Sequence, residues 1–313
     1  MLITSRHFLL SLFWSYCCLC SIGYGSENIQ TETIFWLVDA VRDYGFTVEE
    51  TACALSLTPD RVKMLLNTLP LPTSARWTNT DRIKVLPYPG GRHPRIGFLD
   101  GAKNPERGTK AGLFAPWDDR SYIVVDLPEA IFSNLGLLFL AHTHIPTIWD
   151  QQNIKSATGE WARNPDGSLE MSRVLPNQVA FGSRIIPRKD GADMELWLRN
   201  GDSKKLTGLR TQICVLLKGA KGFQSQTNDN KTFSKPVAVA KAINSSCYIL
   251  TAWQQCGRVW GNEQCPCIHS DPVLPDCEPG QTVRVQGRII FYEGSNIEKI
   301  QNQLTVEFAS GKP

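Results

Sequence analysis

Apolar residues in the first part of the chain recur three and four positions apart, which is the spacing of one helix face. The residues of this first stripe are Ile34, Leu37, Val38 and Val41. The run Thr47-Val48-Glu49-Glu50 has the form of a capping box, in which a threonine hydroxyl and a glutamate carboxylate satisfy free amides at a helix start. Thr58-Pro59 supplies a cap and a proline at the start of a further helix. The sequence therefore predicts three short helices between residues 33 and 69.

From about residue 85 the period changes to two, which is the repeat of β-strands. Met194, Leu196 and Leu198 alternate with their neighbours as in a half-exposed strand, and residues 121–126 form a buried one. The other predicted strands, each bounded by Gly, Pro, Asn or Asp, are 95–99, 137–140, 179–186, 211–217, 247–253 and 282–292. Many strands without long amphipathic helices between them predict a mainly β fold, a large antiparallel β-sandwich or barrel.

Three segments divide the chain. Residues 1–25 have a basic start, an apolar run and small residues at the end, which is the layout of a cleavable secretory signal; an uncleaved anchor is the alternative. Residues 26–75 form the small helical module, Pro70-Leu71-Pro72 begins a linker, and residues 82–313 form the β-sandwich domain. The sequence therefore predicts an exported protein, periplasmic or extracellular, with no membrane span in the mature chain.

The formal net charge of +3 gives no reason to expect a polyanionic partner. Residues 47–67 resemble the helix-turn-helix of DNA-binding proteins, but acidic residues outnumber basic ones in the helical module. Phosphate contacts supply most non-specific DNA affinity, so we expect no nucleic-acid partner. The module is predicted to cap the β domain or to dock a protein partner.

Cysteines outside the predicted signal are concentrated near the end of the chain. In an exported protein such clusters usually form disulfides. The candidate disulfide cysteines are Cys214, Cys247, Cys256, Cys265, Cys267 and Cys277, with Cys53 left over in the helical module. Four of them, Cys256, Cys265, Cys267 and Cys277, form with His269 the alternative of a zinc site, because thiolates and imidazole suit that ion.

The middle strands of the predicted β domain carry a set of short motifs. They are Leu175-Pro176-Asn177, Phe181-Gly182, Asp193 to Gly201, Leu206 to Leu209, Gln212 to Cys214 and Glu278 to Thr282. This set resembles the galactose mutarotase-like (aldose epimerase-like) proteins, which implies a supersandwich fold and a carbohydrate ligand. It also implies a histidine acid and a carboxylate base that exchange protons with a sugar. The late glutamate motif of that family is missing here.

A closer resemblance covers residues 85–295. Tyr88 to Arg95 and Ala141 to Thr147 resemble motifs of an uncharacterised family of exported bacterial proteins. That resemblance implies no known activity, so the function has to be argued from individual residues.

His142 and His144 point to the same side of an extended segment, so both imidazoles could reach one metal or one sugar. Glu129 and Asp150 lie on flanking segments and supply carboxylates. These four are the candidate catalytic residues, with a histidine as general acid and a carboxylate as general base. The two histidines are also candidate ligands of a divalent metal. Gly136, six residues before His142, matches the start of a cupin metal motif, and a purely structural hydrogen-bonded pair is the remaining alternative.

The turn Gly90-Gly91 allows a ligand to approach the backbone closely, and arginine offers a planar fork for a carboxylate or vicinal hydroxyls. The candidate substrate-binding residues are Arg92, His93, Arg95, Asp100 and Trp149, the last because its ring could stack on a sugar. A turn whose arginine pairs with a nearby acid is the alternative.

Three functions remain open. The leading prediction is an exported carbohydrate-binding or carbohydrate-modifying protein. The second is a cupin-like metalloprotein that uses the His142 and His144 pair, and the third is a non-catalytic interaction protein whose helical module docks a partner. The sequence leaves open whether the protein is an enzyme.

Overall fold

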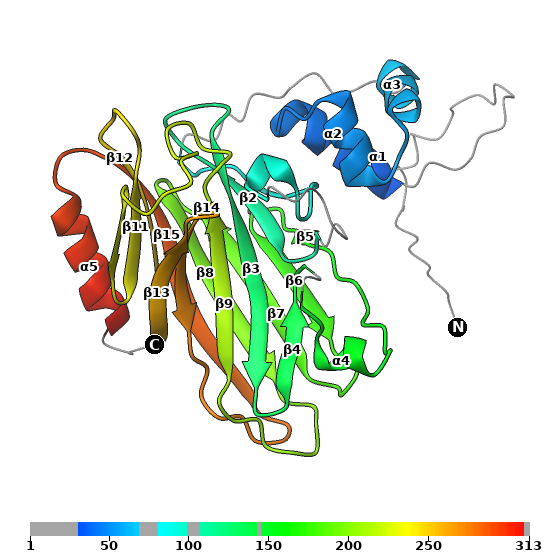
Figure 1. Cartoon of the computed structure of the whole chain (residues 1–313), viewed down its shortest axis with the longest axis vertical. Coiled ribbons are helices and arrows are strands. Elements are labelled where there is room, and N and C mark those ends of the chain that lie inside the picture. Colours follow the sequence, from blue (N-terminus) through cyan, green and yellow to red (C-terminus); the bar gives the residue numbers. More distant parts are fainter. Residues whose placement is uncertain (1–30, 69–80, 99–106, 143–144, 310–313) are drawn as a thin grey trace, which may run out of the picture.

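The computed structural model describes residues 31–68, 81–98, 107–142 and 145–309. The predicted signal and the linker around Pro70 lie outside these described residues. The first helical elements are α1 (Thr31–Val38), the π-helical turn η1 (Asp39–Asp43), α2 (Val48–Leu55) and α3 (Pro59–Thr68). Figure 1 shows them grouped as a small module beside the β domain.

The capping box predicted at the start of α2 is present. Thr47 Oγ1 accepts a hydrogen bond from the Glu50 backbone N–H at 3.1 Å, and Glu50 Oε2 accepts one from the Thr47 N–H at 2.8 Å. Leu37, Val62 and Leu65 are buried at the centre of the module. The predicted helices are therefore confirmed.

Two antiparallel sheets form the body of the protein, and the mainly β sandwich prediction is confirmed (Figure 1). Sheet A contains, in spatial order, β1 (Val85–Pro87), β2 (Lys110–Phe114), β3 (Tyr122–Ser133), β9 (Arg210–Leu216), β14 (Cys265–Pro272) and β13 (Cys256–Asn262), and β4 (Gly136–Leu140) also pairs with β3. Sheet B contains β10 (Lys231–Ser234), β11 (Val237–Lys241), β12 (Cys247–Trp253), β15 (Thr282–Glu293), β8 (Gly191–Arg199), β7 (Ala180–Pro187), β6 (Leu169–Val174) and β5 (Ala162–Arg163).

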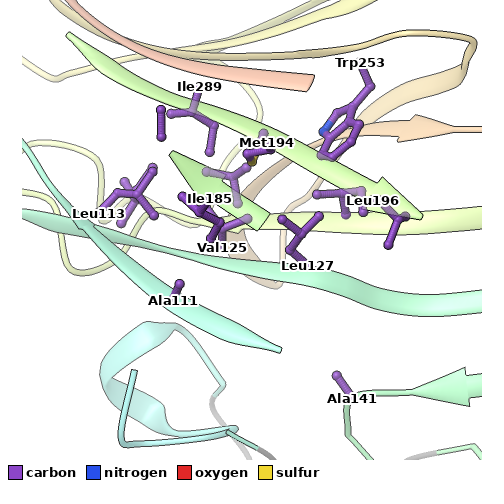
Figure 2. Packing of buried hydrophobic residues seen from close by; sticks show 14 of the residues in the cluster. Ala111, Leu113, Val125, Leu127, Ala141, Ile185, Met194, Leu196, Trp253 and Ile289 are labelled. Atoms are coloured by element: carbon purple, nitrogen blue, oxygen red, sulfur yellow. The ribbon is translucent and has the colours of Figure 1, made fainter. Parts of the chain in front are cut away.

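The main core lies between the two sheets. Alternate residues of β3, such as Val125 and Leu127, face Ile185 of β7 and Leu196 of β8 (Figure 2). Trp253 is fully buried in the same layer. Because successive residues of a strand point to opposite faces, the neighbouring residues of β3 are left for the outer face of sheet A.

Several elements differ from the sequence-based prediction, among them strands β2, β6, β10, β11, β13 and β14, which were not predicted. The predicted strand 95–99 is wrong, since Pro94–Ile96 forms the short 3-10 helix η2, capped by His93. A proline has no N–H for a sheet ladder, which explains why this segment turns instead. A C-terminal helix, α5 (Ile297–Ala309), was not predicted; it packs Leu304 and Phe308 on the outer face of sheet B. No helix in the described part of the chain has the length and apolar character that a membrane crossing requires.

The helical module packs on the outer face of sheet A. Tyr44 inserts its ring over Gly112 of β2, and its hydroxyl donates to the Leu86 carbonyl oxygen at 2.9 Å. Gly112 is required there because an added Cβ would lie 2.1 Å from the Tyr44 hydroxyl oxygen. Arg95 pairs with Glu50 of α2 at 2.5 Å, which joins the segment after β1 to the module. The outer face of β2 and β3 is therefore covered, and that of β9 and β14 forms part of a cleft.

Candidate functional site

A cleft of about 1130 Å³ opens over the outer face of sheet A. Strands β3, β4, β9, β13 and β14 supply its floor and one side, and the segment of residues 92–98 supplies another. The polar residues that line it include Arg92, Glu129, His142, Cys214, Cys267 and His269. Most of these side chains are buried in the floor of the cleft. A small molecule that enters the cleft can reach them, whereas the flat surface of a protein partner cannot.

Antiparallel register aligns polar residues across the floor. Lys110 of β2 is opposite Asp126 of β3, Asp126 is opposite Cys214 of β9, and Cys214 is opposite His269 of β14. Trp260 of β13 is opposite His269, and the two rings stack with their centroids 4.0 Å apart. Directly opposite residues lie on the same face of a sheet, so this row places a thiol and an imidazole side by side.

Strand β14 adds a second row along its own length. Cys267, His269 and Asp271 are two positions apart, so all three point to the outer face. Cys267 Sγ lies 3.3 Å from His269 Nε2, and His269 Nδ1 lies 3.6 Å from Asp271 Oδ1. The other oxygen of Asp271 accepts hydrogen bonds from Arg258 Nε at 2.9 Å and Trp260 Nε1 at 2.7 Å. The result is a thiol, an imidazole and a carboxylate in line.

The surroundings favour the charged forms of Cys267, His269 and Asp271. Hydrogen bonds from the thiols of Cys214 and Cys265, assisted by His269, hold the pKa of Cys267 well below its usual value. Burial by itself would lower the pKa of His269, but Cys267 and Asp271 outweigh it and raise the pKa to about 10. Burial would raise the pKa of Asp271, yet the contact with His269 leaves that pKa below its usual value. Cys267 and His269 therefore stabilise the charged forms of each other.

The three ligand atoms of Cys214, Cys267 and His269 lie within 4.8 Å of one another. In a tetrahedral zinc site, metal–sulfur bonds of about 2.3 Å and metal–nitrogen bonds of about 2.0 Å separate neighbouring ligand atoms by about 3.5 to 3.8 Å. The three atoms are therefore close enough for small side-chain rotations to bring them to one metal ion. Asp271 lies behind His269 Nδ1, where a carboxylate commonly orients a metal-binding histidine.

Glu129 and His142 form a separate pair in the cleft. His142 Nε2 lies 2.8 Å from Glu129 Oε1, and both side chains are buried. A bulge in β3 turns Glu129 towards the cleft. Asp126 is opposite Cys214 and Ala130 is opposite Gln212, so β3 advances four residues while β9 advances two. Without the bulge, strict alternation would turn Glu129 towards the inner core with Leu127.

The turn after β1 brings only part of the predicted set to the cleft. Arg92 lines it and lies over the Phe98 ring, with its guanidinium carbon 4.5 Å from the ring centroid. His93 Nδ1 accepts a hydrogen bond from the Arg95 N–H at 3.1 Å, and its ring stacks on Phe46 of the helical module. Arg95 is engaged by Glu50, so His93 and Arg95 connect the turn to the module.

The segment after His142 contributes to a neighbouring pocket. Trp149 is buried and donates its indole N–H to the Leu138 carbonyl oxygen at 2.8 Å. Asp150 caps the short helix α4 (Ile148–Gln151) by accepting a hydrogen bond from the Thr147 N–H at 2.8 Å. Both line a pocket of about 550 Å³ separate from the main cleft residues Glu129 and His142. His144 and Asp100 lie outside the described residues.

The predicted disulfide cysteines are not bridged. All seven cysteines in the described part of the chain are free thiols. Cys214, Cys265 and Cys267 meet in the cleft, which the sequence alone did not indicate. Cys256 lies near Ser270, with 3.4 Å between the hydroxyl oxygen and the sulfur, and Cys277 lies 3.3 Å from the Gln281 carbonyl oxygen. Cys247 is buried in the core between the sheets.

Comparisons with known proteins leave the family open. No family model matches the chain, and no curated protein matches it. One solved structure with detectable similarity is described as "Putative kojibiose phosphorylase from human microbiome", with 8% sequence identity and a TM-score of 0.37. The alignment covers 61% of this chain and spans 26% of the length of that protein. The resemblance to mutarotase-like proteins has no counterpart among these matches and stays a prediction.

Proposed function

We propose that the protein is a metal-dependent enzyme whose cleft binds one zinc ion, or a similar divalent transition-metal ion, through Cys214, Cys267 and His269. The observation that carries this proposal is the convergence of their three ligand atoms within 4.8 Å at the floor of a cleft. Thiolate and imidazole are the ligands that zinc prefers, and two sulfurs with one nitrogen leave a fourth position open. All three residues line the cleft, which a substrate or water can enter.

Three neighbouring thiols are better explained by a metal than by packing alone. A buried thiol with no partner behaves as a small apolar residue, whereas Cys267 contacts His269 Nε2 at 3.3 Å and lies beside two further thiols. Cys265 lines the same cleft and interacts with Cys267, so it adds a third sulfur to the cluster. A bound cation would take the place of the protons that the thiols and the imidazole otherwise carry.

Metal analysis of the purified full chain tests the proposal. We expect about one zinc per chain, lost in Cys267→Ser and in His269→Ala, while Cys53→Ser, on an exposed position of α2, keeps it. Cobalt replacement gives a second readout, because sulfur ligation produces an intense near-ultraviolet charge-transfer band. Wild-type protein that binds no zinc and shows no such band with cobalt contradicts the proposal.

A cysteine nucleophile is the second candidate, favoured by the same line of residues. Cys267 Sγ lies 3.3 Å from His269 Nε2, and Asp271 lies behind the imidazole, which is the order of a thiol, a base and an orienting carboxylate. Metal-free protein distinguishes the two candidates. A nucleophile predicts rapid alkylation of Cys267 by iodoacetamide that zinc does not slow, whereas a metal ligand predicts protection by zinc.

The ligand of the cleft and the export of the protein remain proposals from the sequence. Phe98 and Trp260 line the cleft together with Glu129 and His142, and this mixture of aromatic and polar groups suits a polar ring such as a sugar. Calorimetric titration with glycans tests this choice. Equal affinity of the wild type and His142→Ala would remove His142 from any sugar site.

A further inference from the structure

The carboxylate of Glu129 is buried, but only one of its two oxygens has a hydrogen-bond partner among the described residues. Its side chain is 9% exposed, and Oε1 lies 2.8 Å from His142 Nε2. Oε2 is buried and has no hydrogen-bond partner among the residues that the structure describes. A buried carboxylate oxygen without a hydrogen bond is costly in free energy, so Oε2 is suited to accept one from a molecule in the cleft.

Glu129 lines the same cleft as the three proposed metal ligands, and its strand β3 pairs with the strand β9 that carries Cys214. The negative charge of Glu129 raises the pKa of Cys214, for which burial is the larger cause. It likewise contributes to the raised pKa of His269. The cleft therefore holds a half-free carboxylate together with the three proposed metal ligands, on the strand that neighbours β9.

We propose that Glu129 is the proton acceptor of this site and that the group it deprotonates is a water molecule in the cleft that donates a hydrogen bond to Oε2. This inference rests on the proposed function. Glu129 takes one proton from the water, and the hydroxide that remains attacks an electrophilic carbon such as that of an ester. His142 is a positioning residue, because its contact with Oε1 fixes the rotamer that presents Oε2.

For an ester, the balance of the step is complete. The water oxygen forms a bond to the carbonyl carbon, the bond from that carbon to the alkoxy oxygen breaks, and the products are an acid and an alcohol. The proton on Glu129 passes to solvent or to the leaving oxygen. The proposed reaction is therefore a hydrolysis. Its substrate is an ester or another carbonyl compound that is small enough to enter the cleft.

Hydrolysis of 4-nitrophenyl acetate by the zinc-loaded full chain tests the inference. We expect Glu129→Gln to lower kcat/KM by about 100-fold, the low end for loss of a general base, without any change in zinc content. His142→Gln should give a smaller loss, because the carboxylate stays but its orientation loosens. Glu298→Gln, an exposed carboxylate of α5 outside the cleft, should keep the wild-type rate.

Zinc content is measured first, so the two proposals fail separately. Wild type without zinc contradicts the proposed function. A zinc-loaded wild type no faster than the zinc-free chain, or a Glu129→Gln variant as fast as wild type, overturns the role of Glu129. Loss of zinc in Glu129→Gln also overturns it, since Glu129 would then be a ligand. If Glu129→Gln does not fold, Glu129→Asp is used in its place. The shorter side chain should leave the zinc content unchanged and lower kcat/KM.

Discussion

Lys110 and Asp126 form a fully buried ion pair at one end of the polar row. Lys110 Nζ lies 2.7 Å from Asp126 Oδ2, and Thr109 donates its hydroxyl to the other carboxylate oxygen at 2.5 Å. Removal of one partner leaves an uncompensated buried charge. We expect Asp126→Asn to lower the free energy of unfolding by about 3 to 5 kcal/mol, measured by urea denaturation. Asp276→Asn, which removes an exposed partner of Lys205, should change it by less than about 1 kcal/mol.

Individual residues of the site were only partly predictable. Arg92, Glu129 and His142 were chosen from their motifs, and the structure places all three in one cleft. Cys267 and His269 were considered as zinc ligands, but with Cys256, Cys265 and Cys277 as companions. Their neighbour in space is Cys214, which depends on the register between β9 and β14. Register is a property of paired strands, so the sequence of one strand does not contain it.

At the scale of elements, the contact between the helical module and sheet A depends on one missing side chain. A Cβ at Gly112 would lie 2.1 Å from the Tyr44 hydroxyl oxygen, so Gly112→Ala must displace the ring. Overpacking of this kind costs about 1 to 3 kcal/mol, and we expect a matching loss of stability with faster proteolysis of residues 31–68. Adding Tyr44→Phe removes the nearest atom and should recover part of the loss. Full stability in Gly112→Ala would contradict this packing.

The ion pair between Glu50 and Arg95 makes the same contact sensitive to pH. Burial would raise the pKa of Glu50, but hydrogen bonds from Arg95 and the Thr47 N–H leave it below the usual value. A depressed folded-state pKa stabilises the fold above the ordinary glutamate value of about 4.3, and the effect is lost as the pH falls through the folded-state pKa. We expect the module to become protease-sensitive below about pH 4. Glu50→Gln should be sensitive already at pH 7.

Helices and strands with a regular pattern of apolar residues or a clear cap could be predicted from the sequence. Elements that mix prolines, polar and apolar residues could not. The capped helix α2 and strands such as β12 (Cys247–Trp253) follow from caps and β-branched or aromatic residues. Strand β14, with the sequence CPCIHSDP, contains two prolines and several polar residues, so it resembles a loop. All of its residues are nevertheless buried, because one face meets the core and the other meets the cleft. The function of that second face overrides the usual preferences of a strand.

For the whole molecule, the proposed metal couples strands that are distant in the chain. Cys214 lies on β9 and His269 on β14, so the unfolded chain offers no preformed site. Zinc at 100 times its dissociation constant should raise the free energy of unfolding by about 2.7 kcal/mol. Thermal unfolding with zinc and with a chelator measures this shift. Cys267→Ser should show none, and an equal shift in that variant would place the zinc elsewhere.

The alternation along β14 restricts which changes of chain length the protein can tolerate. One residue inserted between Cys267 and His269 would send the imidazole into the hydrocarbon between the sheets, because every later side chain would exchange faces. Two inserted residues would restore the face but move the imidazole one step past Cys214. Viable length variants in this strand should therefore carry their extra residues in a local bulge, as β3 does before Ala130.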